Sequence, residues 1–204
     1  MDSSGSLHEE GFLEQKDFIK AIVETLDVSP SDSQIGVITY SDKASVPIKF
    51  SEYEYQEDLI KAIGALPYNG KTTRIDKAIA MATKELMIPG AGRREDTPGI
   101  MVILTDGRQT PESDTTPSEE AAANLEQLGI RTLVVGIGEL ANEKELRKMT
   151  VRDDDVFLAP SLKLLPNFAQ PVAASICEAA GINFKALFRL FWNRASVSGY
   201  LPST

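Results

Sequence analysis

Two runs of almost uninterrupted apolar residues constrain the fold of this chain more than any other feature of its sequence. They are GIMVILTDG at residues 99–107 and IRTLVVGIG at residues 130–138. A strand without polar alternation is typical of a parallel sheet that is covered by helices on both faces. Between the two runs, residues 118–129 carry apolar side chains at helical spacing. This order of strand, helix and strand predicts an α/β fold.

The same alternation extends over most of the chain. Residues 33–42 and 44–50 are rich in β-branched and aromatic side chains, which predicts a hairpin, and Pro47 indicates that its second strand lies at an edge. Residues 155–160 predict a short last strand. Apolar spacing predicts the remaining helices over residues 9–26, 55–66, 74–87, 142–149 and 164–180. We expect an open, mostly parallel, doubly wound sheet with helices on both faces.

Length and composition predict one globular domain. With 204 residues, of which 42% are hydrophobic and 25% charged, the chain is long enough for one ordinary domain and short for two. We expect this domain to cover residues 1–180. Residues 181–204 do not fit the alternation, and we expect a linker or an accessory helix there. A membrane-surface or partner-binding helix is the alternative for this tail, to which we assign no function.

Charge and missing motifs exclude several classes of function. The net charge of −9 repels phosphate backbones, so we expect no nucleic-acid partner. No stretch approaches the roughly 18 to 20 apolar residues of a membrane span, so we expect no membrane insertion. The sequence has neither a G-x-S-x-G elbow nor a G-x-G-x-x-G loop. We therefore expect no enzyme, with a Mg²⁺-dependent phosphotransfer enzyme as the enzymatic alternative.

Carboxylate and hydroxyl side chains occur in three stretches that the predicted sheet brings to one edge. These are D-x-S-x-S at residues 2–6, the threonines of NGKTTRID at residues 69–76, and LTDG at residues 104–107. Loops at the carboxyl ends of strands form the ligand sites of such sheets. A purely oxygen donor set suits Mg²⁺, with Mn²⁺ or Ca²⁺ as alternatives, and is poor for zinc. The candidate metal ligands are Asp2, Ser4, Ser6, Thr73 and Asp106.

Simpler structural roles compete with these assignments. Ser6 and Glu9 have the S-x-x-E spacing of a helix capping box, so the first motif could be helix-start chemistry alone. The acidic run at residues 153–155 is expected to be a solvated loop rather than a second metal site. His8 is the only histidine, and we expect its side chain to face solvent.

Taken together, these stretches resemble a known family. D-x-S-G-S at residues 2–6, the threonine ahead of RIDKAI, and MVILTDG at residues 101–107 are similar to the metal-ion-dependent adhesion site of von Willebrand factor type A domains. LVVGIG at residues 133–138 and the closing helix with ICEA at residues 176–179 resemble later elements of that family. The resemblance covers about residues 1–180.

The resemblance implies roles for the candidate ligands. It implies direct coordination of the metal by the hydroxyls of Ser4, Ser6 and Thr73. The carboxylates of Asp2 and Asp106 would act mostly through water or hydrogen bonds. Thr73 is preferred to Thr72 because it lies six positions before Ile79, which is the spacing usual in the family.

The resemblance also implies a function. The expected function is a protein-binding module of a cell-matrix or extracellular-matrix protein, which grips an acidic residue of its ligand through bound Mg²⁺. The ligand would be collagen or another matrix protein, and the chain would be extracellular or part of an ectodomain, as in matrilins or type VI collagen. An intracellular domain that serves as a scaffold in a multiprotein complex is the alternative.

Three features qualify the resemblance. Family members commonly have glycine near Asp76, whose carboxylate we expect to be solvated, with a water-mediated contact to the site as the alternative. In the family a central apolar strand runs into D-x-S-x-S, whereas here only Met1 precedes the motif, so we expect a fragment of marginal stability whose first central strand is truncated. The resemblance implies a disulfide partner upstream for Cys177, and a buried core thiol is the alternative.

Overall fold

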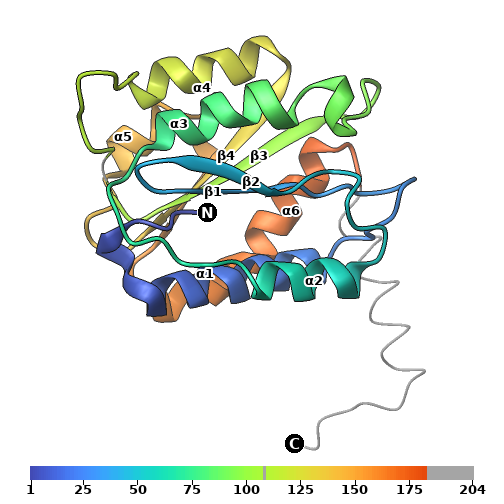
Figure 1. Cartoon of the computed structure of the whole chain (residues 1–204), viewed down its shortest axis with the longest axis horizontal. Helices are drawn as coiled ribbons and strands as arrows, with labels where there is room; N and C mark the ends of the chain where they lie inside the picture. The colour runs from blue at the N-terminus through green and yellow to red at the C-terminus, as the bar shows by residue number, and fades with distance from the viewer. Residues whose placement is uncertain (108, 183–204) are drawn as a thin grey trace, which may run out of the picture.

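The protein, described here by a computed structural model over residues 1–107 and 109–182, alternates helices and strands (Figure 1). Its helices are α1 (His8–Val23), α2 (Gln56–Gly64), α3 (Ile75–Met81), α4 (Ser118–Gln127), α5 (Glu143–Arg147) and α6 (Ala169–Ala179). Its strands are β1 (Val37–Tyr40), β2 (Ala44–Ile48), β3 (Gly99–Thr105), β4 (Ile130–Ile137) and β5 (Val156–Ala159). Each helix and strand expected from the sequence is present, with small shifts at its ends.

The strands form two separate sheets within the described residues. β1 and β2 are an antiparallel pair, in which Val37 lies opposite Ile48. β3, β4 and β5 form a parallel sheet in that order, with Gly99 opposite Ile130 at one end of β3. The predicted hairpin and the predicted parallel arrangement of the buried strands are both confirmed.

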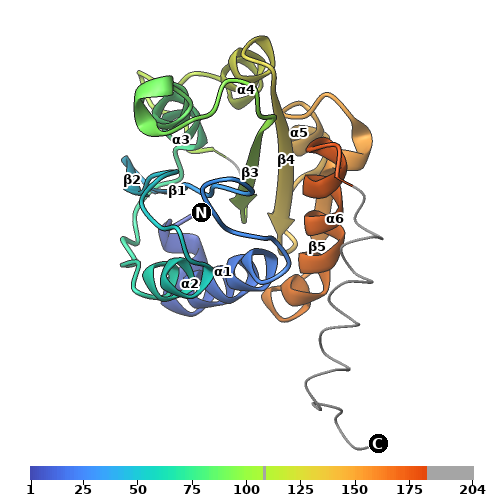
Figure 2. The same ribbon diagram turned by 90° about the vertical axis from the view of Figure 1, so that its right-hand side faces the viewer.

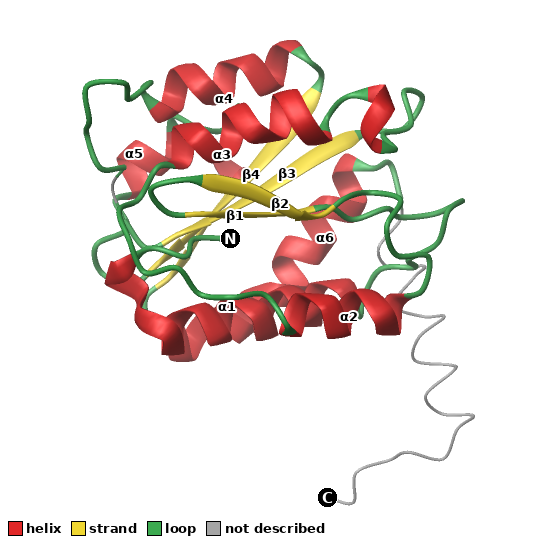
Figure 3. Ribbon diagram, viewed as in Figure 1, coloured by secondary structure: helices red, strands yellow, loops and turns green. Residues whose placement is uncertain are grey.

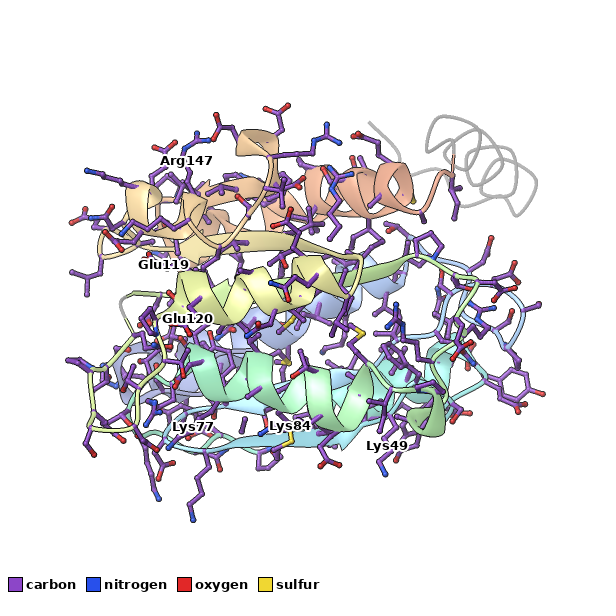
Figure 4. All side chains as sticks on the ribbon, turned by 90° about the horizontal axis from the view of Figure 1, so that it is seen from above. Lys49, Lys77, Lys84, Glu119, Glu120 and Arg147 are labelled. Carbon is purple, nitrogen blue, oxygen red and sulfur yellow. The ribbon has the colours of Figure 1, made fainter. Side chains whose placement is uncertain are left out.

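Helices cover both faces of these strands (Figures 1 and 3). α3 and α4 cover one face, where Ile79 and Leu125 belong to one apolar core. α1, α2 and α6 cover the other face, and Figure 2 shows α6 beside β5. Phe18 and Val172 belong to a second core on that side. The outer surface of the α3–α4 layer is charged and carries Lys77, Lys84, Glu119 and Glu120 (Figure 4).

The first residues of the chain pair with the end of β1. The amino group of Met1 donates to the carbonyl oxygen of Ile38 at 3.0 Å, and the Tyr40 amide donates to the carbonyl oxygen of Met1 at 3.1 Å. The Ser3 amide then donates to the carbonyl oxygen of Tyr40 at 2.7 Å, so the segment runs parallel to β1. In the described chain, residues 1–3 pair with β1 in place of the first central strand, which we expected to be truncated.

Two helices differ in detail from the expectation. A π-helical turn at Ala82–Leu86 continues α3, and a 3-10 helix at Leu162–Phe168, which contains Pro166, leads into α6. Pro171 lies in the first turn of α6, where a missing amide hydrogen removes no helical bond. The expected tail lies outside the described residues from residue 183 onward, so its role stays a prediction, as does the boundary at residue 180.

Candidate metal centre

The D-x-S-x-S loop is fixed by bonds to its own backbone and to α1. The Asp2 carboxylate accepts hydrogen bonds from the Ser4 amide at 2.9 Å and from the Thr105 hydroxyl at 3.2 Å. The side-chain amide of Gln15, on α1, pairs with both backbone groups of Asp2, at 3.0 and 2.7 Å. Asp2, Ser4 and Gln15 are fully buried. This network joins the start of the chain to the carboxyl end of β3.

The loop that carries the candidate threonine lies directly against this motif. The Gly5 amide donates to the carbonyl oxygen of Lys71 at 2.6 Å, and the Gly70 amide donates to the carbonyl oxygen of Ser3 at 2.8 Å. Gly70 has a φ of +69°, and an added Cβ would meet the Tyr68 ring at 3.0 Å, so this close approach requires glycine. The residues 69–73 loop is therefore held beside the D-x-S-x-S motif.

Within that loop the two threonines differ in exposure. Thr73 is 7% exposed, whereas Thr72 is exposed. The backbone of Thr73 pairs with Thr110, whose amide donates to the Thr73 carbonyl oxygen at 2.8 Å and whose hydroxyl accepts from the Thr73 amide at 3.2 Å. Thr110 lies in the loop that follows Asp106. All three predicted stretches thus meet at one edge of the sheets.

The charge of one predicted carboxylate, Asp106, acts on the other, Asp2, across this edge. Asp106 follows the last residue of β3 and is 9% exposed. Burial raises the pKa of Asp2 to about 6, the hydrogen bonds from Ser4 oppose that rise, and the negative charge of Asp106 adds to it. Burial also lowers the pKa of the neighbouring Met1 amino group to about 5. Neither Asp2 nor Asp106 forms an ion pair with any described residue.

The helix capping box expected as an alternative does not form. α1 begins after Leu7, and no side chain caps it. The Ser6 hydroxyl instead lies 3.1 Å from the Ser4 hydroxyl, and the Ser6 side chain is exposed. His8 adopts a φ of 54° at this corner and is exposed, as expected. The Ser6 hydroxyl therefore contacts Ser4 and does not cap the helix.

A buried arginine beside the site escaped the sequence prediction. Arg74 is 1% exposed, and its guanidinium donates two bonds to Asp76, at 2.9 and 2.8 Å. It also donates to Glu112 and Asp114, each at 2.7 Å. The expectation that Asp76 is solvated was wrong, because this carboxylate is 5% exposed and paired. The R-x-D spacing at residues 74–76 is a signal that could have indicated the pair.

The Arg74 cluster also determines how Asp76 titrates and where the next loop lies. Burial alone would raise the pKa of Asp76, but hydrogen bonds from Arg74 and from the Thr116 amide outweigh it and hold that pKa below its usual value. Gln109 accepts from the Asp76 amide at 2.6 Å and donates to the Thr116 carbonyl oxygen at 2.6 Å. The loop over residues 109–116 is thereby fastened to the start of α3.

Two other predictions from the sequence meet different outcomes. Asp155 is not solvated as expected, because it is 1% exposed and pairs with both ends of the Arg131 guanidinium, at 2.9 and 2.6 Å. Cys177 is a free thiol buried in the core, and burial raises its pKa.

Among the described residues, no group of three or more His, Cys, Asp or Glu side chains is placed to hold a metal. A site here depends on hydroxyl donors as well as carboxylates.

Comparison with known proteins decides the family. A model of the von Willebrand factor type A domain matches residues 1–171. The chain belongs to this family. Its relatives include the collagen alpha-1(XII) chain of Notophthalmus viridescens, 27% identical over 88% of this chain, and matrilin-1 of Gallus gallus, 27% identical over 87%. The chain spans 19% and 35% of the length of these two relatives. These relatives are matrix proteins rather than enzymes.

Solved structures confirm the type A fold. Proximal thread matrix protein 1 from the mussel byssus has a TM-score of 0.81, with 23% identity over 87% of this chain and 46% of that one. A form of that protein with a zinc-occupied MIDAS motif has a TM-score of 0.80. The manganese-loaded TRAP protein of Plasmodium vivax has a TM-score of 0.66, with 15% identity over 84% of this chain and 70% of that one. No helix in the described part of this type A domain is both long and apolar enough to cross a membrane.

Proposed function

We propose that this type A domain is a protein-binding module that holds Mg²⁺ at its metal centre and binds an acidic residue of a matrix protein there. One observation carries the proposal. Asp2 and Asp106 are both buried, the charge of Asp106 acts on Asp2, and no described cationic side chain forms an ion pair with either. Burying two like charges is unfavourable unless a positive charge compensates them. A divalent cation supplies that compensation.

The donor chemistry favours a hard cation. The five candidate side chains offer only oxygen atoms, and such sites suit Mg²⁺, with Mn²⁺ or Ca²⁺ as alternatives. Zinc and manganese in the two solved relatives support a divalent ion at this edge of the fold. Mg²⁺ remains our choice because three of the five donors are neutral hydroxyls, which are poor ligands for softer metals.

Each residue has a distinct part in this proposal. The hydroxyls of Ser4, Ser6 and Thr73 hold the ion directly, while Asp2 and Asp106 compensate its charge through water or hydrogen bonds. Asp2 itself is held by Ser4 and Thr105, and Thr73 is held by Thr110. When bound, the ion supplies an electrophilic position that a carboxylate from the ligand can occupy. The exposed Ser6 side chain marks the side from which that ligand approaches.

The relatives indicate the setting in which this module acts. Collagens, matrilins and von Willebrand factor are extracellular matrix or secreted proteins, which supports an extracellular location for this chain. We propose collagen or another matrix protein as the ligand. Nothing in the fold favours the intracellular scaffold that the sequence left as an alternative.

A binding assay on immobilised matrix proteins tests the proposal. In Mg²⁺ the unmodified chain should bind at least one collagen or matrilin of the panel, and excess chelator should abolish this binding. Asp106→Ala, and Ser4→Ala with Ser6→Ala, should reduce it about 100-fold, because the ion is lost. Asp58→Ala is the control, since Asp58 forms an exposed pair with Lys61 on α2, away from the site. Binding that is unchanged in chelator would contradict the mechanism.

A further inference from the structure

Two neighbouring side chains of α1, Gln15 and Lys16, bond to the backbone on both sides of the candidate metal centre. Both side chains are buried, although each is polar. Phe12, which is also buried, lies about one turn before them on the same helix. We call Phe12, Gln15 and Lys16 the α1 platform. None of its members is a candidate metal ligand.

Gln15 holds the D-x-S-x-S loop through both polar atoms of its side-chain amide. The oxygen accepts from the Asp2 amide at 3.0 Å, and the nitrogen donates to the Asp2 carbonyl oxygen at 2.7 Å. Because buried backbone groups need partners, this pairing fixes where Asp2 lies. The Asp2 carboxylate in turn accepts from the Ser4 amide at 2.9 Å, so the position of Ser4 depends on Gln15.

Lys16 holds the start of the segment that leads to Thr73. Its ammonium group donates to the carbonyl oxygens of Gly64 and Leu66, at 3.0 and 3.2 Å. Gly64 is the last residue of α2, which lies beside α1 (Figures 1 and 2). Carbonyl groups at the C-terminal end of a helix lack helical partners and attract a cation. Lys16 thus fixes the point from which the chain runs to Thr73.

Tyr68 connects the platform to both loops. Its ring packs against Phe12, with ring centroids 5.9 Å apart, and its hydroxyl donates to the Ser4 carbonyl oxygen at 3.1 Å. The Lys16 Nζ lies 5.5 Å from the centroid of the Phe12 ring, so the platform is itself a packed unit. One helix therefore supports the segments of both Ser4 and Thr73.

We propose that Gln15 and Lys16 are positioning residues, which set the Mg²⁺ affinity of the proposed metal centre by holding the two loops at the spacing that one ion requires. Neither side chain touches the ion. Mg²⁺ demands near-ideal octahedral geometry, so a small displacement of one hydroxyl weakens its binding. Groups that support direct ligands typically change metal affinity by about 10–100-fold. This inference rests on the proposed function, because it concerns the same site.

Variants of similar size on α1 test the proposal by titration calorimetry with Mg²⁺. Gln15→Met removes both bonds to Asp2 without a change of charge and should weaken Mg²⁺ binding about tenfold. Lys16→Met should cause a similar loss. The sign is decisive here, because the removal of a positive charge would by its field alone make Mg²⁺ binding tighter.

Ile22→Ala is the control for lost stability. Ile22 lies on the same helix about two turns beyond Gln15 and belongs to the second core. This variant should lower the melting temperature and leave the Mg²⁺ affinity of the folded chain unchanged. Three results would overturn the proposal: unchanged affinity in Gln15→Met, tighter binding in Lys16→Met, or an equal loss of affinity in Ile22→Ala.

Amide exchange in chelator separates this inference from the proposed function. The Gly5 amide donates to the Lys71 carbonyl oxygen and the Gly70 amide to that of Ser3, so both amides report on the contact between the two loops. Gln15→Met and Lys16→Met should speed exchange at these amides at least about tenfold relative to amides of β4, and Ile22→Ala should not. Absence of Mg²⁺ binding by the unmodified chain would contradict the proposed function. Equal changes at the two glycines and in β4 would overturn the positioning roles, whether or not the unmodified chain binds Mg²⁺.

Discussion

Two buried acidic groups lie at the same edge of this domain and differ in how their charge is compensated. Asp76 pairs with Arg74 through two hydrogen bonds and accepts another from the Thr116 amide. Asp2 is also buried, is affected by the negative charge of Asp106, and forms no ion pair with a described cation. The pKa of Asp76 is held below its usual value, whereas burial raises that of Asp2 to about 6.

The difference separates a structural group from a binding group. The Arg74 cluster is complete within the described chain, so its role is to fasten the loop over residues 109–116. Asp2 and Asp106 form no ion pair with a described cation, which supports our proposal that they compensate the charge of a bound metal ion. Asp155, which pairs with Arg131 at 2.9 and 2.6 Å, is a second example of the structural kind.

The largest expected change in stability comes from removing the Arg74 guanidinium, which compensates the charge of Asp76. Arg74→Met should lower the free energy of unfolding by about 3–5 kcal/mol, because it leaves the Asp76 carboxylate buried and unpaired. Urea unfolding followed by circular dichroism measures the change. Arg147→Met is the matched control, because its side chain is 37% exposed and solvent-screened ion pairs contribute little to stability. Similar losses in both variants would remove the distinction between buried and exposed pairs.

Removing one charge from the proposed metal centre should stabilise the metal-free protein, which is the opposite of the effect expected for Arg74→Met. Asp2→Asn should raise the free energy of unfolding by about 1–3 kcal/mol at pH 7 in chelator. The reason is that it replaces a buried carboxylate, whose pKa is raised by burial, with a neutral amide. The same change should weaken Mg²⁺ binding about 10–100-fold. Asp76→Asn should instead destabilise the metal-free protein. If both variants shift stability in the same direction, the comparison between the two groups fails.

The stabilisation by Mg²⁺ should depend on pH. The pKa of Asp2 is raised in the folded chain, so its contribution to stability is present below its unfolded value and is lost as pH rises through about 6. A bound cation needs the charged form, so the difference in melting temperature with and without Mg²⁺ should grow from pH 5 to pH 7.5. Taking this difference cancels the pH-dependent contributions of titratable groups that do not contact the ion. A difference that is flat with pH, or one that grows equally in Asp2→Asn, would contradict the assignment.

The smallest expected effect distinguishes the two threonines of the loop. Thr73→Ala should weaken Mg²⁺ binding about tenfold, because it removes one proposed direct ligand. Thr72→Ala should leave binding unchanged, since that side chain is exposed. Titration calorimetry measures both, and melting temperatures check that each variant is folded. A reversed order would assign the ligand to Thr72.

Much of the fold follows from local signals in the sequence. The apolar strands over residues 99–105 and 130–137 and the hairpin before them are specified by continuous or β-branched runs that only a buried sheet accommodates. Helix ends shifted by a few residues, because frayed turns carry weak signals. The π-helical turn at Ala82–Leu86 has no signal that we recognise.

The side-chain environment was harder to predict than the elements. The capping box that Ser6 and Glu9 offered as an alternative does not form, because the loop is held by Gln15 and Lys71 instead.

Asp76 and Asp155 were expected in solvent, yet each is buried against an arginine. Arg74 lies two residues before Asp76, so local spacing could have indicated that pair. Arg131 lies 24 residues before Asp155, so spacing within one segment cannot reveal that partner, which depends on a tertiary contact. The assignment of the metal ligands, which rests on three segments meeting, stays a prediction.

Titration of the chain with Mg²⁺, followed by amide chemical shifts in nuclear magnetic resonance, tests the central claim most directly. The account predicts saturable binding of one ion, with the largest shifts at Ser4, Ser6, Thr73 and Asp106. It also predicts that Asp106→Asn abolishes these shifts while Asp58→Asn, in an exposed ion pair on α2, leaves them in place. The account would be contradicted if these residues showed no saturable shift. It would also be contradicted if the shifts were confined to the backbone amides of exposed acidic residues elsewhere.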